Sequence, residues 1–548
     1  MASQATFESR GALKIEPHGG PVRRCSRRIS CLFLAFTVGL TNLADGQTPR
    51  PTTPFQPVVP KAWDDAALAG LELPLAAPTN SPKHVSADYY YRIRVRRIHQ
   101  SYPVYHPDKE PPGYQEKLRR LEPVILWDDR GTRPPLKTEA DWIAAGSLVF
   151  ESPIAIDVGR IAANSSWNLV VREPAWHRDV GAPVTSDGVL PFYRYVIRDQ
   201  GKVELGVLSC AMCHTRVMPD GSVIKGAQGN LPFDRAFAYD LRDKGALLDV
   251  SRRLERQLYG APWVRPDSQA QMDAWSLEQI ALPHAVIPAG TLARHGTSPL
   301  SPVQVPDLIG IRERRYLDRT GLQQHRDIAD LMRYAALNQG GDDLSTFGDF
   351  VPLIAMAGKM PSPGANPFGR YNDEQLYALA LYLYSLAAPA NPNAPASDEH
   401  KALARRGSEI FHDSENRCAA CHKPPLYTNN KLVRAPGFEL PDNHPAHDDV
   451  LSQRVNTDPT LTLTTRRGTG LYKVPSLLGV WYRGPFEHNG SVATLEDWFD
   501  ERRLRDDYVP TGWKGPPGTV TRAVKGHEYG LDLPAQDKKA LIAFLKTL

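Results

Sequence analysis

The clearest hydrophobic pattern in the chain is an amphipathic stretch that occurs twice, at residues 374–386 and 536–548. Side chains three and four positions apart share one face of a helix, so each stretch is predicted to form a helix with one buried face. The apolar positions at this spacing are Leu379, Tyr382, Leu383 and Leu386 in the first stretch and Leu541, Phe544, Leu545 and Leu548 in the second.

Two shorter patterns are repeated in the same order ahead of these predicted helices. Gly-Ser-Leu-Val-Phe at residues 146–150 corresponds to Gly-Ser-Glu-Ile-Phe at 407–411, each at the end of a helix-like stretch. Val-Pro-Asp-Leu-Ile-Gly-Ile at 305–311 corresponds to Val-Pro-Ser-Leu-Leu-Gly-Val at 474–480. Repeated features in a constant order indicate an internal duplication of one structural unit.

Each copy also holds a Cys-x-x-Cys-His motif. Two thiols three positions apart can each form a thioether with a vinyl group of one haem, and the histidine after them is then held beneath the iron as a ligand. Redox-active Cys-x-x-Cys motifs and four-thiolate zinc sites use similar thiol spacing but do not require the trailing histidine. The sequence therefore predicts two covalently bound haem c groups, held by Cys210, Cys213, His214, Cys418, Cys421 and His422.

The separation between equivalent features falls along the chain, from 261 residues to 208, 169 and 162. The first copy therefore carries insertions of about 53, 39 and seven residues, and the two larger ones flank the first haem motif. We expect a mainly α-helical protein with two tandem cytochrome c-like haem domains, the first enlarged by insertions. The expected boundaries are a signal peptide at 1–46, an irregular amino-terminal extension at 47–138, haem domain 1 at 139–386, a linker at 387–400 and haem domain 2 at 401–548.

Residues 1–46 have the pattern of an export signal, with four arginines ahead of an apolar run at 29–40 and small residues at its end. That run is too short to span a bilayer, and no later stretch predicts a membrane span. We therefore expect a periplasmic or secreted protein. Residues 1–46 hold six basic and three acidic residues, which leaves 59 basic and 58 acidic residues in the rest. This balance gives no reason to expect nucleic acid as a partner.

The sixth ligand of each iron decides whether a haem relays electrons or reacts with a small ligand. No methionine follows Cys418, and the loop before the last predicted helix holds His527 between residues that include two glycines, which would let the backbone approach the porphyrin. His527 is therefore the first candidate ligand of the second iron. His488, beside an Asn-Gly turn, is the alternative. For either histidine, the competing interpretation is a structural role only, as a hydrogen-bonded residue in a turn. Either ligand would give a bis-histidine haem.

In the first copy, a Lys-Met-Pro loop offers Met360 as the sixth ligand, with Met332 as a second methionine to consider. The alternative is an iron with an open face. Arg319 aligns with His488 and cannot bind iron, because its guanidinium stays protonated. Beside an open iron, Arg319 would polarise the distal oxygen of bound peroxide. An exposed arginine in a turn is the structural alternative.

These motifs, with Gly-Pro-Phe-Glu-His-Asn-Gly-Ser at 484–491, resemble the bacterial di-haem cytochrome c peroxidases and the related di-haem enzyme that matures methylamine dehydrogenase. The second domain, with Gly-His-Glu-Tyr-Gly at 526–530, is most similar to the di-haem rubber oxygenases. The resemblance covers roughly residues 140–548. It implies mostly helical domains with one haem each, in which one haem supplies electrons and the other carries out the chemistry. In the rubber-oxygenase branch the amino-terminal haem is the reactive one.

We therefore expect a periplasmic di-haem oxidoreductase, peroxidase- or oxygenase-like. The haem on His214 would react with peroxide or oxygen, and the haem on His422 would relay electrons. Its partner would be a small redox protein or a quinol-linked electron donor or acceptor. The alternative is an electron-transfer cytochrome without catalysis, in which Met360 and His527 close both irons. A haem-based sensor or binding module is a third class, but no signalling segment is visible in the sequence.

Overall fold

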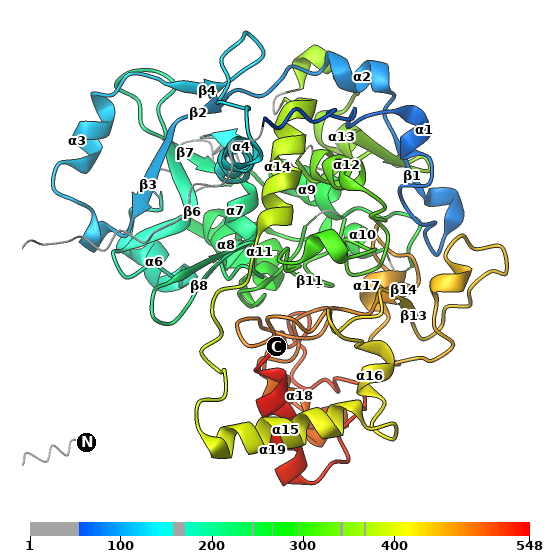
Figure 1. Ribbon diagram of the computed structural model, residues 1–548. Coiled ribbons are helices and arrows are strands. Elements are labelled where there is room, and N and C mark those ends of the chain that lie inside the picture. Colours follow the sequence, from blue (N-terminus) through cyan, green and yellow to red (C-terminus); the bar gives the residue numbers. More distant parts are fainter. Residues whose placement is uncertain are drawn as a thin grey trace, which may run out of the picture. The chain divides into compact units, whose positions relative to one another are not determined.

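The structure is a computed structural model that describes residues 54–548 except 157–169, 244–245, 266, 295, 340–343 and 367–368. The signal peptide expected at 1–46 lies outside the described residues. The described residues belong to one compact unit, and helices predominate over strands in it (Figure 1). The structure is thus helix-rich, as expected, whereas the division into two haem domains stays a prediction. None of the described helices is long and apolar enough to cross a membrane.

Two helix pairs correspond to the repeated sequence patterns. Helix α4 (Glu139–Glu151) packs on α14 (Asp373–Ser385), and α15 (Asp398–His412) packs on α19 (Ala535–Leu545) (Figure 1). The two amphipathic helices predicted from the sequence are α14 and α19, and both are confirmed. Each is paired with the helix that contains the repeated Gly-Ser pattern, so the first and last features of each copy lie against one another.

The glycine of each repeated pattern lies at a helix crossing. A Cβ atom on Gly146 would lie 2.0 Å from the carbonyl oxygen of Ala378, and one on Gly407 would lie 2.0 Å from the carbonyl oxygen of Ala540. Atoms this close would overlap, so only glycine allows the two helix backbones to approach to this distance. The repeated glycines therefore set the spacing of both helix pairs.

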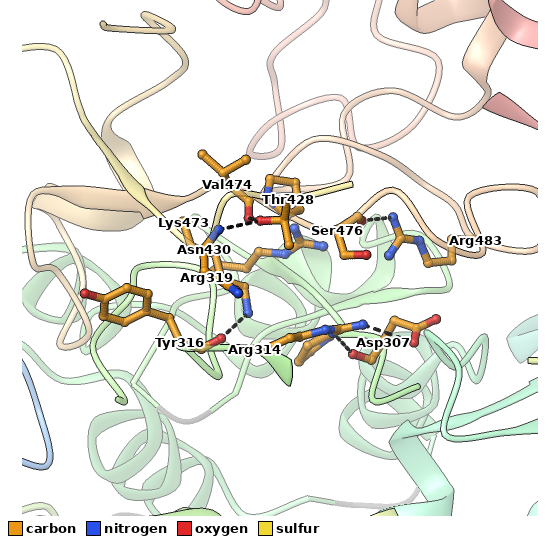
Figure 2. Close-up of a pocket in the computed structure, with 12 residues that line it drawn as sticks. Asp307, Arg314, Tyr316, Arg319, Thr428, Asn430, Lys473, Val474, Ser476 and Arg483 are labelled. Carbon is orange, nitrogen blue, oxygen red and sulfur yellow. Dashed lines mark hydrogen bonds and ion pairs between the residues drawn. The ribbon is translucent and has the colours of Figure 1, made fainter. Parts of the chain in front are cut away.

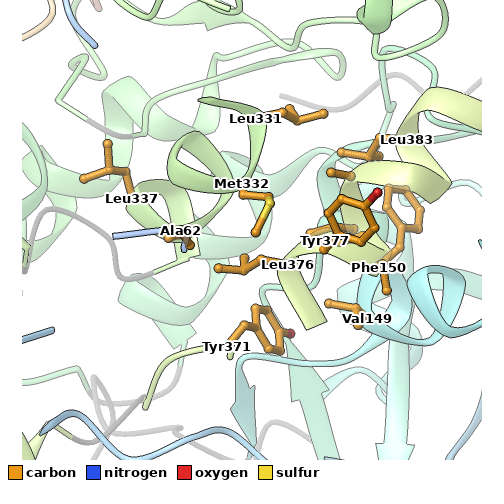
Figure 3. Packing of buried hydrophobic residues seen from close by; sticks show 14 of the residues in the cluster. Ala62, Val149, Phe150, Leu331, Met332, Leu337, Tyr371, Leu376, Tyr377 and Leu383 are labelled. Atoms are coloured by element: carbon orange, nitrogen blue, oxygen red, sulfur yellow. The ribbon is translucent and has the colours of Figure 1, made fainter. Parts of the chain in front are cut away.

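A hydrophobic core lies between α4, α14 and α12 (Ile328–Gln339) (Figure 3). It extends to Ala62 in the amino-terminal extension. A separate core lies between α15 and α19 and includes Phe411 and Phe544. The helices of the two copies thus bury their apolar faces in separate cores.

A four-stranded antiparallel sheet precedes the first haem motif. Its order is β3 (Ser101–Tyr105), β6 (Val189–Val196), β7 (Glu204–Val207) and β5 (Ala155–Ile156). The prediction of a mainly α-helical first domain missed this sheet. Strand β6 is rich in β-branched and aromatic residues, which favour a pleated, half-buried surface. The first large insertion is therefore partly a sheet.

The amino-terminal extension is not irregular throughout, because β3 belongs to it and pairs with β6. Three further strands lie in the extension. Two of them pair with each other and the third pairs with a strand of the first copy, and short helices lie between them. These elements are α1 (Asp65–Leu68), β1 (Pro82–His84), which pairs with β12 (Ser345–Phe347), α2 (Ala87–Arg92), β2 (Ile98–His99), which pairs with β4 (Ile125–Trp127), and α3 (Tyr114–Arg119).

Several of the remaining helices lie between the first haem motif and the repeated Val-Pro pattern, in the region of the second large insertion. Helix α8 (Phe233–Asp243) packs on α11 (Leu277–Ala285), and α9 (Leu248–Tyr259) packs on α13 (Pro352–Ala357). The other elements are α6 (Pro174–Val180), β8 (Thr215–Val217), β9 (Val223–Lys225), α10 (Ser268–Met272), β10 (Thr291–Leu292), β11 (Val303–Gln304), β13 (Leu432–Arg434), α17 (Thr460–Leu463), β14 (Leu471–Lys473) and α18 (Leu495–Trp498).

Candidate haem sites

Each Cys-x-x-Cys-His motif forms a single helical turn, α7 (Cys210–Cys213) and α16 (Cys418–Cys421). The backbone N–H of His214 donates to the carbonyl of Cys210 at 2.9 Å, and His422 does the same to Cys418 at 3.0 Å. In the described part of the chain, none of the four motif cysteines forms a disulfide. The cysteines and the histidine of each motif line one cavity, which is the arrangement that covalent haem attachment requires.

The two motif histidines are held in the same way. Nδ1–H of His214 donates to the carbonyl oxygen of Pro306 at 3.0 Å, and Nδ1–H of His422 donates to the carbonyl of Pro475 at 3.1 Å, a bond shared with the carbonyl of Tyr427. A backbone acceptor on Nδ1 fixes the tautomer that leaves Nε2 free for a metal. The two prolines are equivalent positions of the repeated Val-Pro pattern, and the sequence analysis assigned them no role.

Burial keeps both histidines neutral, as metal ligands must be. Desolvation lowers the pKa of His214 to about 4, against the opposing effect of its bond to Pro306. Desolvation, with a contribution from His527, likewise lowers the pKa of His422 to about 4. Both Nε2 atoms therefore carry a free lone pair at neutral pH.

The cavity at His214 encloses roughly 1210 Å³ of empty space, part of it open to solvent. Its walls combine apolar side chains with a few cations, which suits a porphyrin with a flat apolar face and charged carboxylates. The apolar residues include Leu292, Val303, Leu308, Leu379 and Leu383, and the cations are Arg294, Arg319 and Arg467.

Neither methionine considered from the sequence lies in this cavity. Met360 is 38% exposed and follows α13, and it is absent from the described cavity lining. Met332 is 0% exposed and points into the core between α4, α12 and α14 (Figure 3). The opposite face of α12 instead turns Tyr334 and Asn338 towards the cavity. The helical period of α12 was the signal that could have identified these two residues.

The cavity at His422 encloses roughly 1380 Å³, also partly open to solvent, and His527 faces His422 across it. The centroids of the two imidazole rings are 6.3 Å apart. With metal–nitrogen bonds of about 2.0 Å, two imidazoles on opposite sides of one iron have centroids roughly 6 Å apart. The spacing therefore fits a bis-histidine haem.

The loop that carries His527 is held by backbone contacts. His527 has a positive φ of 47°, and its N–H donates to the carbonyl of Val455 at 2.6 Å. Arg503 donates to the carbonyls of Gly526 and His527, each at 2.9 Å. A Cβ atom on Gly526 would lie 2.4 Å from the backbone nitrogen of Thr457. In the structure, this glycine thus allows a close approach to another loop of the protein.

His488 lines the same cavity but is engaged by its neighbours. Its Nδ1 lies 2.9 Å from a carboxylate oxygen of Glu487, and its ring packs against Tyr472 with centroids 4.6 Å apart. Burial opposes ionisation of Glu487, but hydrogen bonds from His488 outweigh it and lower the pKa of this carboxyl to about 2. Nε2 of His488 is buried without a hydrogen-bond partner. His527 has the better placement opposite His422, and His488 stays the alternative.

Arg319 lies in the wall between the two haem cavities. It lines the cavity of His214, the cavity of His422 and a smaller gap between them (Figure 2). Burial, with repulsion from Arg483 and Arg314, lowers the pKa of Arg319 to about 9, so the guanidinium stays charged at neutral pH. Its expected role at bound peroxide stays a hypothesis.

No protein-family model matches the chain. A stretch of 166 residues, 27% of this chain, is 27% identical to the cytochrome-c peroxidase IdrP1 of Denitromonas iodatirespirans. This match spans 40% of the length of that relative.

Solved structures give weaker likenesses. A MauG-like protein associated with microbial copper homeostasis is 17% identical, with coverage of 56% of this chain and 90% of that chain and a TM-score of 0.27. The diheme peroxidase BthA from Burkholderia thailandensis E264 is 16% identical, with coverage of 54% and 84% and a TM-score of 0.24. TM-scores at this level establish no common fold. The sequence match confirms the expected resemblance of part of this chain to a cytochrome c peroxidase.

Proposed function

We propose that this protein is an exported, periplasmic or secreted, di-haem oxidoreductase of the peroxidase or oxygenase kind. The observation that carries the proposal is a difference between two equivalent cavities. Each contains a Cys-x-x-Cys-His motif, but among the described residues only the cavity of His422 places another histidine opposite the motif histidine. One site is thus suited to electron relay and the other to binding a small ligand.

The residues of each cavity fit a covalently held haem c. The paired thiols would form the thioethers, and Nε2 of His214 or His422 would bind the iron. When bound, such groups supply one-electron transfer at a six-coordinate iron and reaction with peroxide or oxygen at an iron with an open face. At the second site, His527 would provide the sixth ligand, with His488 as the alternative.

The first cavity offers hydrogen-bonding groups in place of a sixth ligand. Tyr334 and Asn338 lie one turn apart on α12, and both line the cavity. Burial raises the pKa of Tyr334, so its hydroxyl remains a donor at neutral pH. Donors fixed beside a reacting oxygen stabilise the charge that develops on it. Tyr334 and Asn338 would therefore orient peroxide or oxygen in this cavity.

The second site would exchange electrons with the first through the wall that both cavities share. Gln304 and Arg319 line both cavities, so protein side chains rather than bulk solvent separate them. A bis-histidine iron has no free position for a substrate and is suited to relay. The external partner would be a small redox protein or a quinol-linked donor or acceptor.

The competing function is an electron-transfer cytochrome with two closed irons. It requires a sixth ligand at the first iron. Among the described residues that line this cavity there is no methionine and no histidine other than His214. This observation favours the oxidoreductase over the carrier.

Electron paramagnetic resonance of the purified holoprotein tests the proposal. In the oxidised protein, we expect a low-spin ferric signal from the second iron. We expect a high-spin ferric signal from the first iron, either in the oxidised protein or after reduction of the second iron. Peroxide should then convert the high-spin species. A first iron that stays low-spin both before and after reduction of the second, and that does not react with peroxide, would establish the carrier instead.

A further inference from the structure

The gap between the two haem cavities is built from both sequence copies (Figure 2). It encloses roughly 430 Å³, part of it open to solvent. Pro306 and Pro475, whose carbonyls hold the two motif histidines, both line it. The gap therefore lies next to the iron-binding histidine of each site.

The side chains around this gap carry an excess of positive charge. Four cations line it, whereas Asp307 is its single carboxylate among the described residues. A buried excess of cations disfavours a bound metal ion and favours an anion. The four cations are Arg314, Arg319, Lys473 and Arg483.

Three of the four cations have partners within the protein. Arg314 lies 3.7 Å from a carboxylate oxygen of Asp307 and also donates to backbone carbonyls. Lys473 Nζ donates to the carbonyls of Tyr316 and Leu317 at 3.1 and 2.9 Å. Arg483 donates to the carbonyl of Ser476 at 2.8 Å. Carbonyls satisfy the N–H groups of these side chains but do not neutralise their charge.

Arg319 differs from the other three. In the described part of the chain its guanidinium has no hydrogen bond or ion pair, and its Nε is buried without a partner. An unpaired charge inside a protein is strongly unfavourable, so a guanidinium in this position calls for an anion. Among the described residues, Arg319 is also the one cation that lines both haem cavities as well as the gap.

We propose that Arg319 binds haem propionate carboxylates from both sites, with Lys473 and Arg483 assisting on the side of the second haem. This inference rests on the proposed binding of two haems. Each haem c carries two carboxylates, and a guanidinium offers paired donors that match carboxylate geometry. Lys473 and Arg483 line the second cavity as well as the gap, which places them at the second haem only. The charge of one guanidinium would then influence both irons.

The experiment uses the full holoprotein and measures the reduction potential of each haem by spectroelectrochemical titration. In Arg319→Gln, we expect both potentials to fall, because loss of a nearby positive charge favours the ferric state. Arg319→Lys, which keeps the charge but loses the planar fork, should restore part of the shift. The matched control is Arg315→Gln, an exposed arginine that pairs with Asp449, and it should leave both potentials unchanged.

A second variant keeps the test decisive should Arg319→Gln fail to fold. Arg483→Gln should lower the potential of the second haem alone, because Arg483 lines that cavity and the gap but is absent from the described lining of the first. An unchanged second potential in Arg483→Gln would overturn the propionate assignment. The assignment would also be overturned if Arg319→Gln changed the reaction with peroxide but left both potentials unchanged. That result is expected if Arg319 acts on peroxide.

The anion could instead come from solution, and a further measurement separates the two sources. At constant ionic strength, exchange of chloride for phosphate or acetate should leave the wild-type potentials unchanged if propionates fill the site. Potentials that follow the added anion in wild type but not in Arg319→Gln would contradict the inference. A wild-type protein without two haems, measured as the pyridine haemochrome, would overturn the proposed function as well, whereas two haems with no effect of Arg319 would overturn this inference alone.

Discussion

The imidazole of His527 stands opposite that of His422, and their ring centroids are 6.3 Å apart. This spacing leads to a prediction about ligation. In His527→Ala, the second haem should lose its low-spin spectrum, because the iron would lose its sixth ligand. Absorption and paramagnetic resonance spectra of the holoprotein measure this change.

The control for this variant is His488→Ala, which removes the other candidate histidine of the same cavity. Its second-haem spectrum should stay that of the wild type. If the two variants exchange these results, His488 is the ligand and the assignment of His527 is wrong. Because Glu487 and Tyr472 hold His488 in place, its removal should affect folding more than ligation.

A second prediction concerns the glycines at the helix crossings. Gly407→Ala would place a methyl carbon 2.0 Å from the carbonyl oxygen of Ala540 and force α15 away from α19. Overpacking of this kind costs about 1–3 kcal/mol or more. Thermal or urea unfolding should therefore show clear destabilisation, and Gly146→Ala should behave alike at Ala378.

Gly364→Ala is the control for the glycine variants, because a Cβ atom there would meet no atom within 4 Å. Its stability should stay within about 0.5 kcal/mol of the wild type. Equal stabilities of Gly364→Ala and Gly407→Ala would show that the helix pairs tolerate a wider spacing than the structure has.

The features that could be predicted from sequence are those encoded within a few residues. The Cys-x-x-Cys-His motifs define their chemistry through spacing alone, and each folds into one helical turn. The helices α14 and α19 follow from their apolar period. His527 was identified because its Gly-rich loop precedes the last helix, and its position opposite His422 agrees with that hypothesis.

The features that were missed depend on contacts between distant residues. The bond from His214 to Pro306 joins residues 92 positions apart, so no local pattern shows it. Met360 lies in a loop whose sequence suits a ligand, yet chain folding leaves it exposed. The sheet around β6 was overlooked because its strands lie in the amino-terminal extension and in an insertion, neither of which has a counterpart in the second copy. Local sequence thus predicted the two Cys-x-x-Cys-His motifs and the helices of each copy, but little of the structure around the motifs.

A third prediction concerns a buried ion cluster in the second insertion. His284 lies between two carboxylates, with Nδ1 2.7 Å from Asp234 and Nε2 3.2 Å from Glu255, and all three side chains are buried. Burial alone would lower the pKa of His284, but Glu255 and Asp234 outweigh it and raise the pKa to about 10. The nearby rings of Tyr259 and Phe237 complete its surroundings.

The sign of the pH dependence follows from this raised pKa. Stabilisation from charged His284 is fully present below the unfolded pKa of about 6.5 and is lost as pH rises towards 10. His284→Ala should cost about 3–5 kcal/mol near neutral pH, because it leaves two buried carboxylates without a cation. It should also flatten the loss of stability between pH 6.5 and 10. Urea unfolding across this range measures both effects, with the exposed His400→Ala as control.

The same cluster could be stabilised by a proton on a carboxylate in place of charge on the histidine. Burial raises the pKa of Glu255, which works in that direction. In that case His284→Ala would retain the wild-type pH profile and lose stability uniformly. An unchanged slope would therefore reject a charged His284 while leaving the buried contacts intact.

The last prediction tests whether the first cavity is a reaction site. Tyr334 presents the hydroxyl of a buried tyrosine to this cavity from α12. Removal of a single donor that stabilises developing charge typically lowers a rate by about 10²–10³-fold. In Tyr334→Phe, the reaction of the holoprotein with peroxide should slow by at least about tenfold, while the spectrum of the second haem stays unchanged. Stopped-flow absorption resolves the two haems.

Tyr377→Phe, on α14 and absent from the described cavity lining, is the matched control and should react at the wild-type rate. Equal rates for both variants would mean that Tyr334 does not contact the reacting oxygen, and the choice between reaction site and closed carrier would then depend on the spin state of the first iron.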